Sequence, residues 1–354
     1  MPFLEFHNVS IAGIACAVPS YVQTIDSGQD NSKSTYIKHF IKQTGIRQRH
    51  ISLLEQTCTD LSYAASLKAM KLAGWSSEDI DAVVFITQTP DYTRPGNACL
   101  LQYMLGLTKN TLAFDINLGC SAFPYGLSVC GSLLQHNKIR RIIMACGDAV
   151  WPFYVSREAV LADDTFVHGE GGAAVLLEKK NATPLCLALY TDGSGFHYLF
   201  DPKGARNAWR ELGEAGIPVY GGQMDGVEIT TFSTTTAVDA IKEFTSHYDL
   251  ELAACDGLVL HQANLQIIKT MAKRLNMDPA KVPVSLDRYA NTSSASVPLT
   301  IADAYAGCEK EQLFILAAGF GIGLSWGVAS LTISPLVIEP IFIYDGVFKE
   351  GFIQ

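Results

Sequence analysis

Long apolar runs and an excess of basic residues are both missing from this sequence. No stretch of about 20 apolar residues occurs, so we expect no membrane-spanning segment. Residues 1–20 lack a basic start and have a polar break at His7–Asn8, so we expect no signal peptide. The 26 Lys and Arg residues are outnumbered by 35 Asp and Glu residues, which leaves a net charge of −9. This balance argues against a general nucleic-acid-binding protein, because such proteins need a basic surface to displace counterions.

Motifs for structural zinc and for dinucleotides are missing as well. The nine cysteines include no CxxC pair, which argues against a zinc site and suits a reducing, cytoplasmic environment. Gly319, Gly321 and Gly323 look like a dinucleotide fingerprint, but a strand-like run from Trp326 follows them instead of a helix. Glycines at these positions let the backbone approach a ligand closely.

Short apolar runs alternate with amphipathic stretches along the chain, which is typical of an α/β protein. Strands are predicted at residues 9–16, 82–89, 113–117, 141–146, 173–177, 257–260, 313–318 and 326–333. Helices are predicted at residues 61–73, 121–135, 229–244 and 265–275. The plan repeats, so we expect two related halves, 1–180 and 181–354, with an extra apolar tail from about residue 335. Each half places one reactive side chain after a strand, where open α/β sheets usually carry their chemistry.

Cys120 is the candidate nucleophile, in the segment FDINLGCSAF between a predicted strand and a predicted helix. Free backbone N–H groups and the helix dipole at such a position lower the pKa of a thiol and favour the thiolate. A buried structural role is commoner for cysteine, and we assign that role to the other eight. The small-residue turn at 119–122 favours a nucleophile here.

His261 and Asn291 are the candidate partners of this thiol. His261 follows a predicted strand in GLVLHQAN, where a satisfied core histidine is the alternative. Asn291 stands among small and hydroxyl residues before a helix, where a turn or cap asparagine is the alternative. An uncharged amide at that place can donate a hydrogen bond to a developing oxyanion.

Five blocks occur in an order that closely resembles the β-ketoacyl-acyl carrier protein synthase III family of the thiolase superfamily. They are FDINLGCSAF, HGEGGAAVLLE, LHQANLQII, LDRYANTSSASVP and GFGIGLSWG, with TGIRQRH near the N-terminus also matching. The resemblance covers about residues 8–333. It implies a thiolase-like fold of five layers, αβαβα, built from two duplicated halves and assembled as a homodimer. It also implies that no metal or redox cofactor is needed.

The resemblance further implies a decarboxylative Claisen condensation. Cys120 takes an acyl group from acyl-CoA or an acyl-carrier protein, while His261 and Asn291 bind malonyl-carrier protein and stabilise the enolate left by loss of CO2. The backbone N–H groups of Cys120 and Gly323 form the oxyanion hole. Such enzymes serve fatty-acid biosynthesis or related lipid and polyketide pathways.

Basic residues that help dock the acidic carrier protein in this family match Lys273 and Arg274. Lys269 lies on the same predicted helical face as Lys273, and a solvated polar face is the alternative for all three. The family arginine that follows HQANL is replaced by Gln266, so the docking surface has one charge fewer.

The positions that bind the acyl donor depart from the family pattern. The tryptophan and two arginines that clamp coenzyme A align with His39, Gln43 and Ala162, with Phe40 adjacent to the first. A phenylalanine that enters the acyl pocket of the other subunit aligns with Arg94, for which a surface arginine is the alternative. Phe40 and Arg94 are therefore candidate acyl-pocket residues, and we expect an acyl-carrier protein or an unusual acyl-CoA as donor instead of acetyl-CoA.

Two other classes of function fit part of the pattern. A papain-like cysteine hydrolase shares the order Cys, His, Asn, but the CGSCW-type block of that class is missing. A non-enzymatic partner subunit would typically lack the nucleophile, whereas Cys120, His261 and Asn291 are all present. We therefore expect an acyltransferase of the condensing type.

Overall fold

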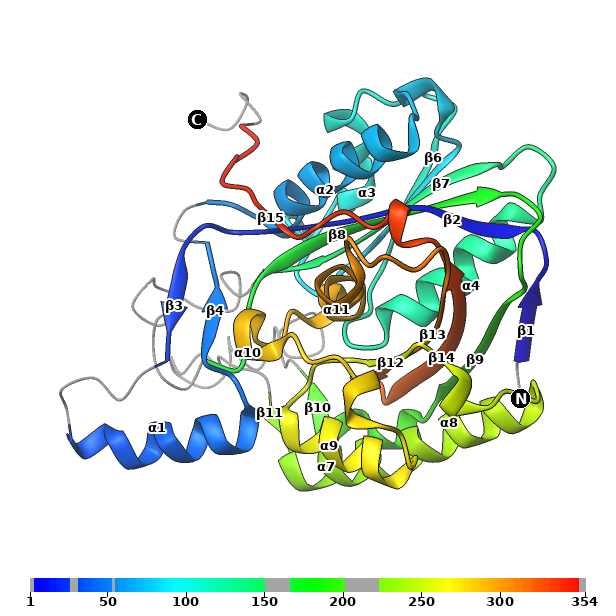
Figure 1. Cartoon of the computed structure of the whole chain (residues 1–354). Helices are drawn as coiled ribbons and strands as arrows, with labels where there is room; N and C mark the ends of the chain where they lie inside the picture. Colours follow the sequence, from blue (N-terminus) through cyan, green and yellow to red (C-terminus); the bar gives the residue numbers. More distant parts are fainter. Residues whose placement is uncertain (1–2, 26–30, 53–54, 150–165, 201–222, 350–354) are drawn as a thin grey trace.

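Two large β-sheets form the frame of the computed structural model, which describes residues 3–25, 31–52, 55–149, 166–200 and 223–349 (Figure 1). The six-stranded sheet runs in the order β15 (Phe342–Ile343), β2 (Val9–Val18), β8 (Gly171–Lys179), β7 (Arg141–Asp148), β5 (Ala82–Ile86), β6 (Leu112–Ile116). The five-stranded sheet runs in the order β1 (Phe3–Phe6), β9 (Leu185–Thr191), β14 (Ser325–Ile333), β13 (Leu313–Gly321), β12 (Gly257–Leu260). Two short pairs, β3 (Val22–Thr24) with β4 (Gln48–His50) and β10 (Leu199–Phe200) with β11 (Gln223–Met224), lie outside them.

Helices fill three layers around these sheets. α4 (Ala122–Leu134) and α11 (Ser296–Tyr305) lie between the sheets and bury side chains such as Phe123 and Leu299 in one core shared with both. α2 (Cys58–Ala73) and α3 (Asn97–Met104) cover the outer face of the six-stranded sheet. α7 (Gly226–Thr234), α8 (Thr236–His247) and α9 (Leu265–Arg274) cover the outer face of the five-stranded sheet. The predicted αβαβα arrangement is confirmed.

The two sheets share one pairing pattern. β5 runs parallel to β7, and β7 is antiparallel to β8, which is antiparallel to β2. In the same way β12 runs parallel to β13, and β13 is antiparallel to β14, which is antiparallel to β9. One edge strand of each sheet comes from the other end of the chain. The N-terminal strand β1 pairs with β9 in the five-stranded sheet, and the C-terminal strand β15 pairs with β2 in the six-stranded sheet. The division into 1–180 and 181–354 stays a prediction, with each sheet completed by a strand from the other end of the chain.

Several element boundaries differ from the sequence prediction. The strand predicted at 82–89 ends at Ile86, and beyond it the Thr87 hydroxyl and the Gln88 N–H bond Asp148. The helix predicted at 229–244 is two helices that meet at Thr235. Threonine hydroxyls there bond carbonyls four residues earlier, which weakens a helix interior.

The tail after Pro335 lies along the first half of the chain. Gln56 Nε2 donates to the carbonyls of Tyr344 and Gly346, and Phe348 N donates to Asp60 Oδ1. Two further helices, α1 (Asn31–Thr44) and the one-turn α10 (Leu286–Tyr289), complete the helices used below. Among the described residues, no helix has the length and apolar character needed to cross a membrane.

Candidate active site

Cys120 lies in the turn between β6 and α4, two residues before the helix begins at Ala122. Glycines of β13 pack directly against it. A Cβ on Gly321 would meet Cys120 Cβ at 2.6 Å, and one on Gly319 would meet the Cys120 carbonyl oxygen at 2.7 Å. Gly319 and Gly321 therefore allow β13 to pack closely on the turn that carries Cys120.

The Cys120 thiol is held in its protonated form. Its pKa is raised to about 12, chiefly by withdrawal from water and secondly by the negative charge of Asp148. Hydrogen bonds from its own backbone N–H, the Ser293 hydroxyl and the Ile322 N–H oppose this rise. The expectation that the helix start lowers the pKa of the resting thiol was therefore wrong, because desolvation outweighs the backbone donors.

Two backbone N–H groups lower the pKa of the Cys120 thiol, its own and that of Ile322, which directly precedes Gly323. The oxyanion-hole role of Gly323 stays a prediction. Gly323 has φ +140°, a conformation that L side chains rarely adopt. Gly323 therefore serves the turn that presents the Ile322 N–H. Ile322 could not be identified from the sequence, because a backbone donor leaves no trace in residue type.

His261 lies at the carboxyl end of β12, buried to 1% exposure. Burial lowers the pKa of its imidazole to about 3, so the ring is neutral at ordinary pH. Its Nδ1 lies 2.6 Å from Ser296 Oγ, and the edge of Phe320 packs at 5.7 Å between ring centroids. A neutral, oriented imidazole can donate from one ring nitrogen while the other accepts.

Asn291 lies in the segment between α10 and α11, half-buried. Its Oδ1 accepts from the Ser293 N–H at 2.9 Å, which fixes the amide so that Nδ2 faces away from that contact. Its backbone N–H donates to the Val167 carbonyl, and its carbonyl accepts from Gly169. Hydrogen bonds to the backbone and to the side chain of Asn291 thus fix the position of its side-chain amide.

One short segment, residues 291–296, links the three predicted catalytic residues. Ser293 bonds Asn291 Oδ1 through its N–H, and its hydroxyl is among the groups that lower the pKa of the Cys120 thiol. Ser296 at the start of α11 bonds His261. The structure therefore gathers Cys120, His261 and Asn291 around this segment, and Ser293 and Ser296 are site residues that the sequence analysis did not identify.

The predicted donor-binding positions lie on exposed surface or in the core. His39 and Gln43 are exposed on α1, and Arg94 is exposed ahead of α3. Phe40 is 9% exposed and packs edge-on against Phe166 in the core under the five-stranded sheet. Ala162 lies outside the described residues.

The predicted docking residues Lys269, Lys273 and Arg274 are exposed on α9. Salt bridges found among the described residues include none of the three. Gln266, where the family has arginine, donates through Nε2 to the Lys42 carbonyl at 3.3 Å and so ties α9 to the end of α1.

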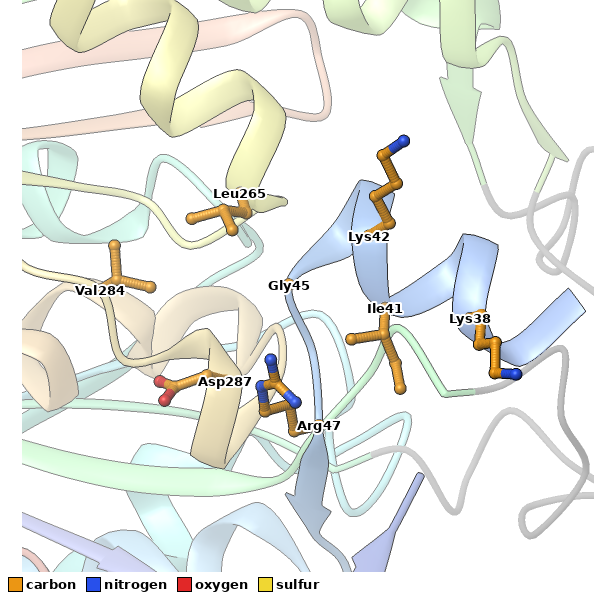
Figure 2. Close-up of a pocket in the computed structure, with 8 residues that line it drawn as sticks. All are labelled: Lys38, Ile41, Lys42, Gly45, Arg47, Leu265, Val284 and Asp287. Atoms are coloured by element: carbon orange, nitrogen blue, oxygen red, sulfur yellow. The ribbon is translucent and has the colours of Figure 1, made fainter. Parts of the chain in front are cut away.

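A hollow of about 630 Å³ lies between α1 and the start of α9 (Figure 2). It is lined by Lys38, Ile41, Lys42, Gly45, Arg47, Leu265, Val284 and Asp287. Figure 2 shows the two lysines reaching outward from successive turns of α1, with Leu265 and Val284 across the hollow. Over the described part of the chain, no cluster of three His, Cys, Asp or Glu side chains could hold a metal ion.

Comparisons with known proteins agree with this geometry. The sequence model described as 3-oxoacyl-[acyl-carrier-protein (ACP)] synthase III matches residues 114–193, and its C-terminal counterpart matches residues 246–333. A beta-ketoacyl-[acyl-carrier-protein] synthase III of Xanthomonas campestris pv. campestris is 37% identical over 328 residues, 91% of this chain and 97% of that protein.

Solved structures show the same fold. The 3-oxoacyl-(acyl-carrier protein) synthase from Burkholderia xenovorans LB400 superposes with a TM-score of 0.87 at 29% identity, over 97% of this chain and 99% of that one. The priming β-ketosynthase of the R1128 polyketide pathway superposes with a TM-score of 0.81 at 24% identity, over 95% and 99%, and shows the fold alone.

Proposed function

Because the chain belongs to the 3-oxoacyl-[acyl-carrier-protein] synthase III family, and is a condensing acyltransferase with the thiolase-like fold of that family, we propose that Cys120, His261 and Asn291 carry its reaction. The observation that supports this assignment best is the shared segment 291–296, in which Ser293 N–H bonds Asn291 Oδ1 and Ser296 Oγ bonds His261 Nδ1. The pathway is fatty-acid biosynthesis or a related specialised lipid or polyketide pathway.

In the first step Cys120 Sγ bonds the carbonyl carbon of an acyl thioester. The thiol of the donor leaves and takes up the proton that Cys120 gives up. Negative charge on the carbonyl oxygen is stabilised by the backbone N–H groups of Cys120 and Ile322, which both reach the position of Sγ. Neither donor needs to move when the charge develops.

In the second step malonyl-carrier protein loses CO2, and the electron pair of the broken bond forms an enolate. Asn291 Nδ2 donates to the enolate oxygen, because its Oδ1 is already held by Ser293. With the Ser296 hydroxyl donating to Nδ1, His261 carries its proton on Nε2 and donates from there. Neutral donors in a dry site favour loss of CO2, since no cation competes for the departing carboxylate.

In the third step the enolate carbon bonds the acyl carbon on Cys120. The carbon–sulfur bond breaks, Sγ leaves as a thiolate and takes a proton from water, and a 3-oxoacyl-carrier protein is released. Substrates and solvent supply every atom and electron, so the chemistry requires no bound cofactor.

Loading of Cys120 tests the assignment directly. Incubation with acyl-CoAs and acyl-carrier proteins, followed by intact mass spectrometry, should add one acyl mass to the wild type and none to Cys120→Ala. Cys308→Ala is the matched control, because Cys308 is also half-buried and lies on the connection after α11. Unchanged condensation by Cys120→Ala would exclude this mechanism.

For the donor, we propose an acyl-carrier protein or an unusual acyl-CoA in a specialised pathway. The observation in favour is that His39 and Gln43 are exposed on α1 and offer neither an aromatic clamp nor a guanidinium for coenzyme A. Arg94 is exposed, so a plain short apolar chain is a poor fit if that side chain enters an acyl pocket. Rapid loading by micromolar acetyl-CoA would contradict this proposal.

For the carrier protein, we propose docking on α9 with α1 beside it. Lys269, Lys273 and Arg274 supply exposed cations on α9. Lys42 stands where Gln266 meets α1, next to the position at which the family carries arginine (Figure 2). A surface with unpaired cations on two adjoining helices suits an acidic protein partner.

Charge reversal tests this docking surface. Lys42→Glu and Lys273→Glu should each lower the ratio of kcat/KM for malonyl-carrier protein to that for malonyl-N-acetylcysteamine by about tenfold, with a flatter dependence on salt. Lys109→Glu is the control, because Lys109 is an exposed lysine between α3 and β6. An equal loss with both thioesters would contradict carrier docking.

For the assembly, we propose a homodimer that covers β6. This strand is the edge of the six-stranded sheet, and its five residues, from Leu112 at 44% exposure, are exposed or half-buried despite being mostly apolar. An uncovered apolar edge invites pairing with another chain. Sedimentation at micromolar concentration should give a dimer, and a monomer would contradict the proposal.

A further inference from the structure

A fully buried arginine that the reaction steps above do not use lies in the middle of β4. Arg49 is 0% exposed, which is rare for arginine unless its donors are engaged. Its Nε and Nη2 donate at 2.9 and 2.7 Å to Oε1 of Gln23, the residue directly opposite on β3. Its Nη1 donates to the His168 carbonyl at 2.9 Å, and the guanidinium lies 5.4 Å from the centre of the Phe166 ring. The planar fork is therefore fixed in one orientation.

The stretch of chain that contains His168 runs alongside Asn291. The Asn291 N–H donates to the Val167 carbonyl at 3.0 Å, and the Gly169 N–H donates to the Asn291 carbonyl at 3.0 Å, which makes a parallel bridge between His168 and Asn291. In such a bridge the partners of Asn291 are the residues on either side of His168, so the His168 carbonyl points away from Asn291. Arg49 binds that carbonyl, and the bridge strand therefore lies between Arg49 and Asn291.

The backbone around Asn291 depends on this bridge. Ala290 has φ +55° and Ser293 has φ +49°, a region in which non-glycine residues persist only where their surroundings hold them. The approach of the bridge strand is also close, since a Cβ on Gly169 would meet the Tyr289 carbonyl oxygen at 2.0 Å. A small shift of the bridge strand would therefore move the Asn291 amide.

The backbone of β4 contacts both parts of the chain that meet at this bridge. The His50 carbonyl accepts from the Glu170 N–H at 2.9 Å, just after the bridge strand. The Arg47 N–H donates to the Asp287 carbonyl of α10 at 3.1 Å, just before Asn291. Arg49 stands between these two backbone contacts and adds the side-chain bond to the bridge strand itself.

We propose that Arg49 is a positioning residue for Asn291, because its guanidinium holds the bridge strand where that strand fixes the Asn291 backbone. The inference rests on the proposed role of Asn291 as a donor to the enolate. Because Arg49 acts through Asn291, it supports loss of CO2 from malonyl-carrier protein and not the acyl loading of Cys120.

Separate measurement of the two steps tests the proposal. Arg49→Met should slow single-turnover CO2 release from malonyl-carrier protein on acyl-loaded enzyme about tenfold, because a displaced catalytic donor loses its alignment with the substrate. Acyl loading of Cys120, followed by intact mass spectrometry, should stay close to wild type. Arg288→Met is the matched control, since it breaks the two 2.6 Å bonds to Asp303 three residues before Asn291 and should leave the ratio of the two rates unchanged. Equal slowing of both steps in Arg49→Met would overturn the proposal.

The half-buried partner Gln23 provides a second test that does not depend on the folding of Arg49→Met. Gln23→Leu removes the acceptor of Nε and Nη2 and should slow CO2 release without slowing acyl loading. Gln23→Glu keeps an acceptor at the same place and should retain the wild-type rate. Equal rates of CO2 release in the two variants would overturn the positioning role of Arg49.

A double-mutant cycle shows whether Arg49 acts through Asn291. In the Asn291→Ala background, Arg49→Met should cause no further loss of CO2 release, because the amide that it positions is already missing. Losses that multiply would overturn the proposal. Wild-type CO2 release by Asn291→Ala alone would instead defeat the proposed function, so the two failures are distinguishable.

Discussion

The ends of β5 and β12 are equivalent positions in the two halves of the molecule. β5 ends at Ile86, paired with Cys146 of its parallel neighbour β7, and β12 ends at Leu260, paired with Ala318 of β13. Both neighbours then pair antiparallel with the strand that follows them, β8 and β14. The residue after β5 is Thr87, and its counterpart after β12 is His261.

The neighbouring strands β7 and β13 carry chemically different residues just beyond these two positions. Two residues beyond Cys146 the first half has Asp148, whereas two residues beyond Ala318 the second half has Phe320. In the first half a hydroxyl donates to a carboxylate, from Thr87 to Asp148 at 2.9 Å. In the second half an aromatic edge packs against the imidazole of His261.

The difference divides the chemistry between the halves. The first half has a carboxylate held by four neutral hydrogen-bond donors at this position, and the second half keeps its histidine buried and uncharged. Both reach the same segment, since Ser294 bonds Asp148 and Ser296 bonds His261. The same pattern of strand pairing thus carries a buried carboxylate, Asp148, in one half and a neutral histidine, His261, in the other.

The largest expected effect comes from making the second half resemble the first. His261→Thr removes the neutral N–H donor to the enolate, and loss of one such donor costs about 10²–10³-fold in rate. Release of CO2 from malonyl-carrier protein should fall by that factor, while acyl loading of Cys120 should stay close to wild type. His197→Thr, at an exposed histidine, is the matched control. Equal loss of both steps would contradict the division of roles between the halves.

How much of this site the sequence could predict depends on what each residue contributes. The proposed roles of Cys120, His261 and Asn291 depend on side chains placed after strands or before a helix, so pattern and residue type pointed to them. The proposed role of Ile322 depends on its backbone N–H, which residue type does not reveal.

Asp148 and Ser293 could not be found from the sequence for another reason. Each matters through partners that are distant in the chain, 61 residues from Asp148 to Thr87 and 205 from Ser293 to Gln88. The α/β class followed from alternating apolar runs, because burial imposes them, whereas the five layers were implied by the family resemblance. The pKa of Cys120 was misjudged because helix position is visible in a sequence, whereas desolvation by the facing sheet is not.

An intermediate effect is expected in the pH dependence of stability. The pKa of His261 is lowered to about 3, whereas an unfolded chain takes up this proton near 6.5. The contribution to stability is therefore fully present above pH 6.5 and is lost as pH falls toward 3. Between pH 7 and pH 5 the loss is about 2 kcal/mol.

Denaturant unfolding of the wild type and of His261→Asn at both pH values isolates this contribution. Asn cannot take up the proton, so the stability of the wild type relative to the variant should fall by about 2 kcal/mol from pH 7 to pH 5. Asp91, whose pKa is raised to about 6 by burial, acts in the opposite direction, but it is present in both proteins and cancels. A difference that does not change with pH would show that His261 is hydrated or charged.

Contrasting effects are expected at the equivalent glutamines that follow Thr87 and His261. Gln262 is 1% exposed and bonds the backbone of residues 260 and 285, on the core side of its turn. Gln262→Ala leaves those groups without partners and should cost about 1–3 kcal/mol of stability. Gln88 is half-buried and bonds Ser293, so Gln88→Ala should cost under about 1 kcal/mol of stability but slow acyl loading about three- to tenfold. Urea unfolding and loading rates measured on both variants should therefore give opposite rankings, and matching rankings would mean that the first half does not position the nucleophile through Ser293.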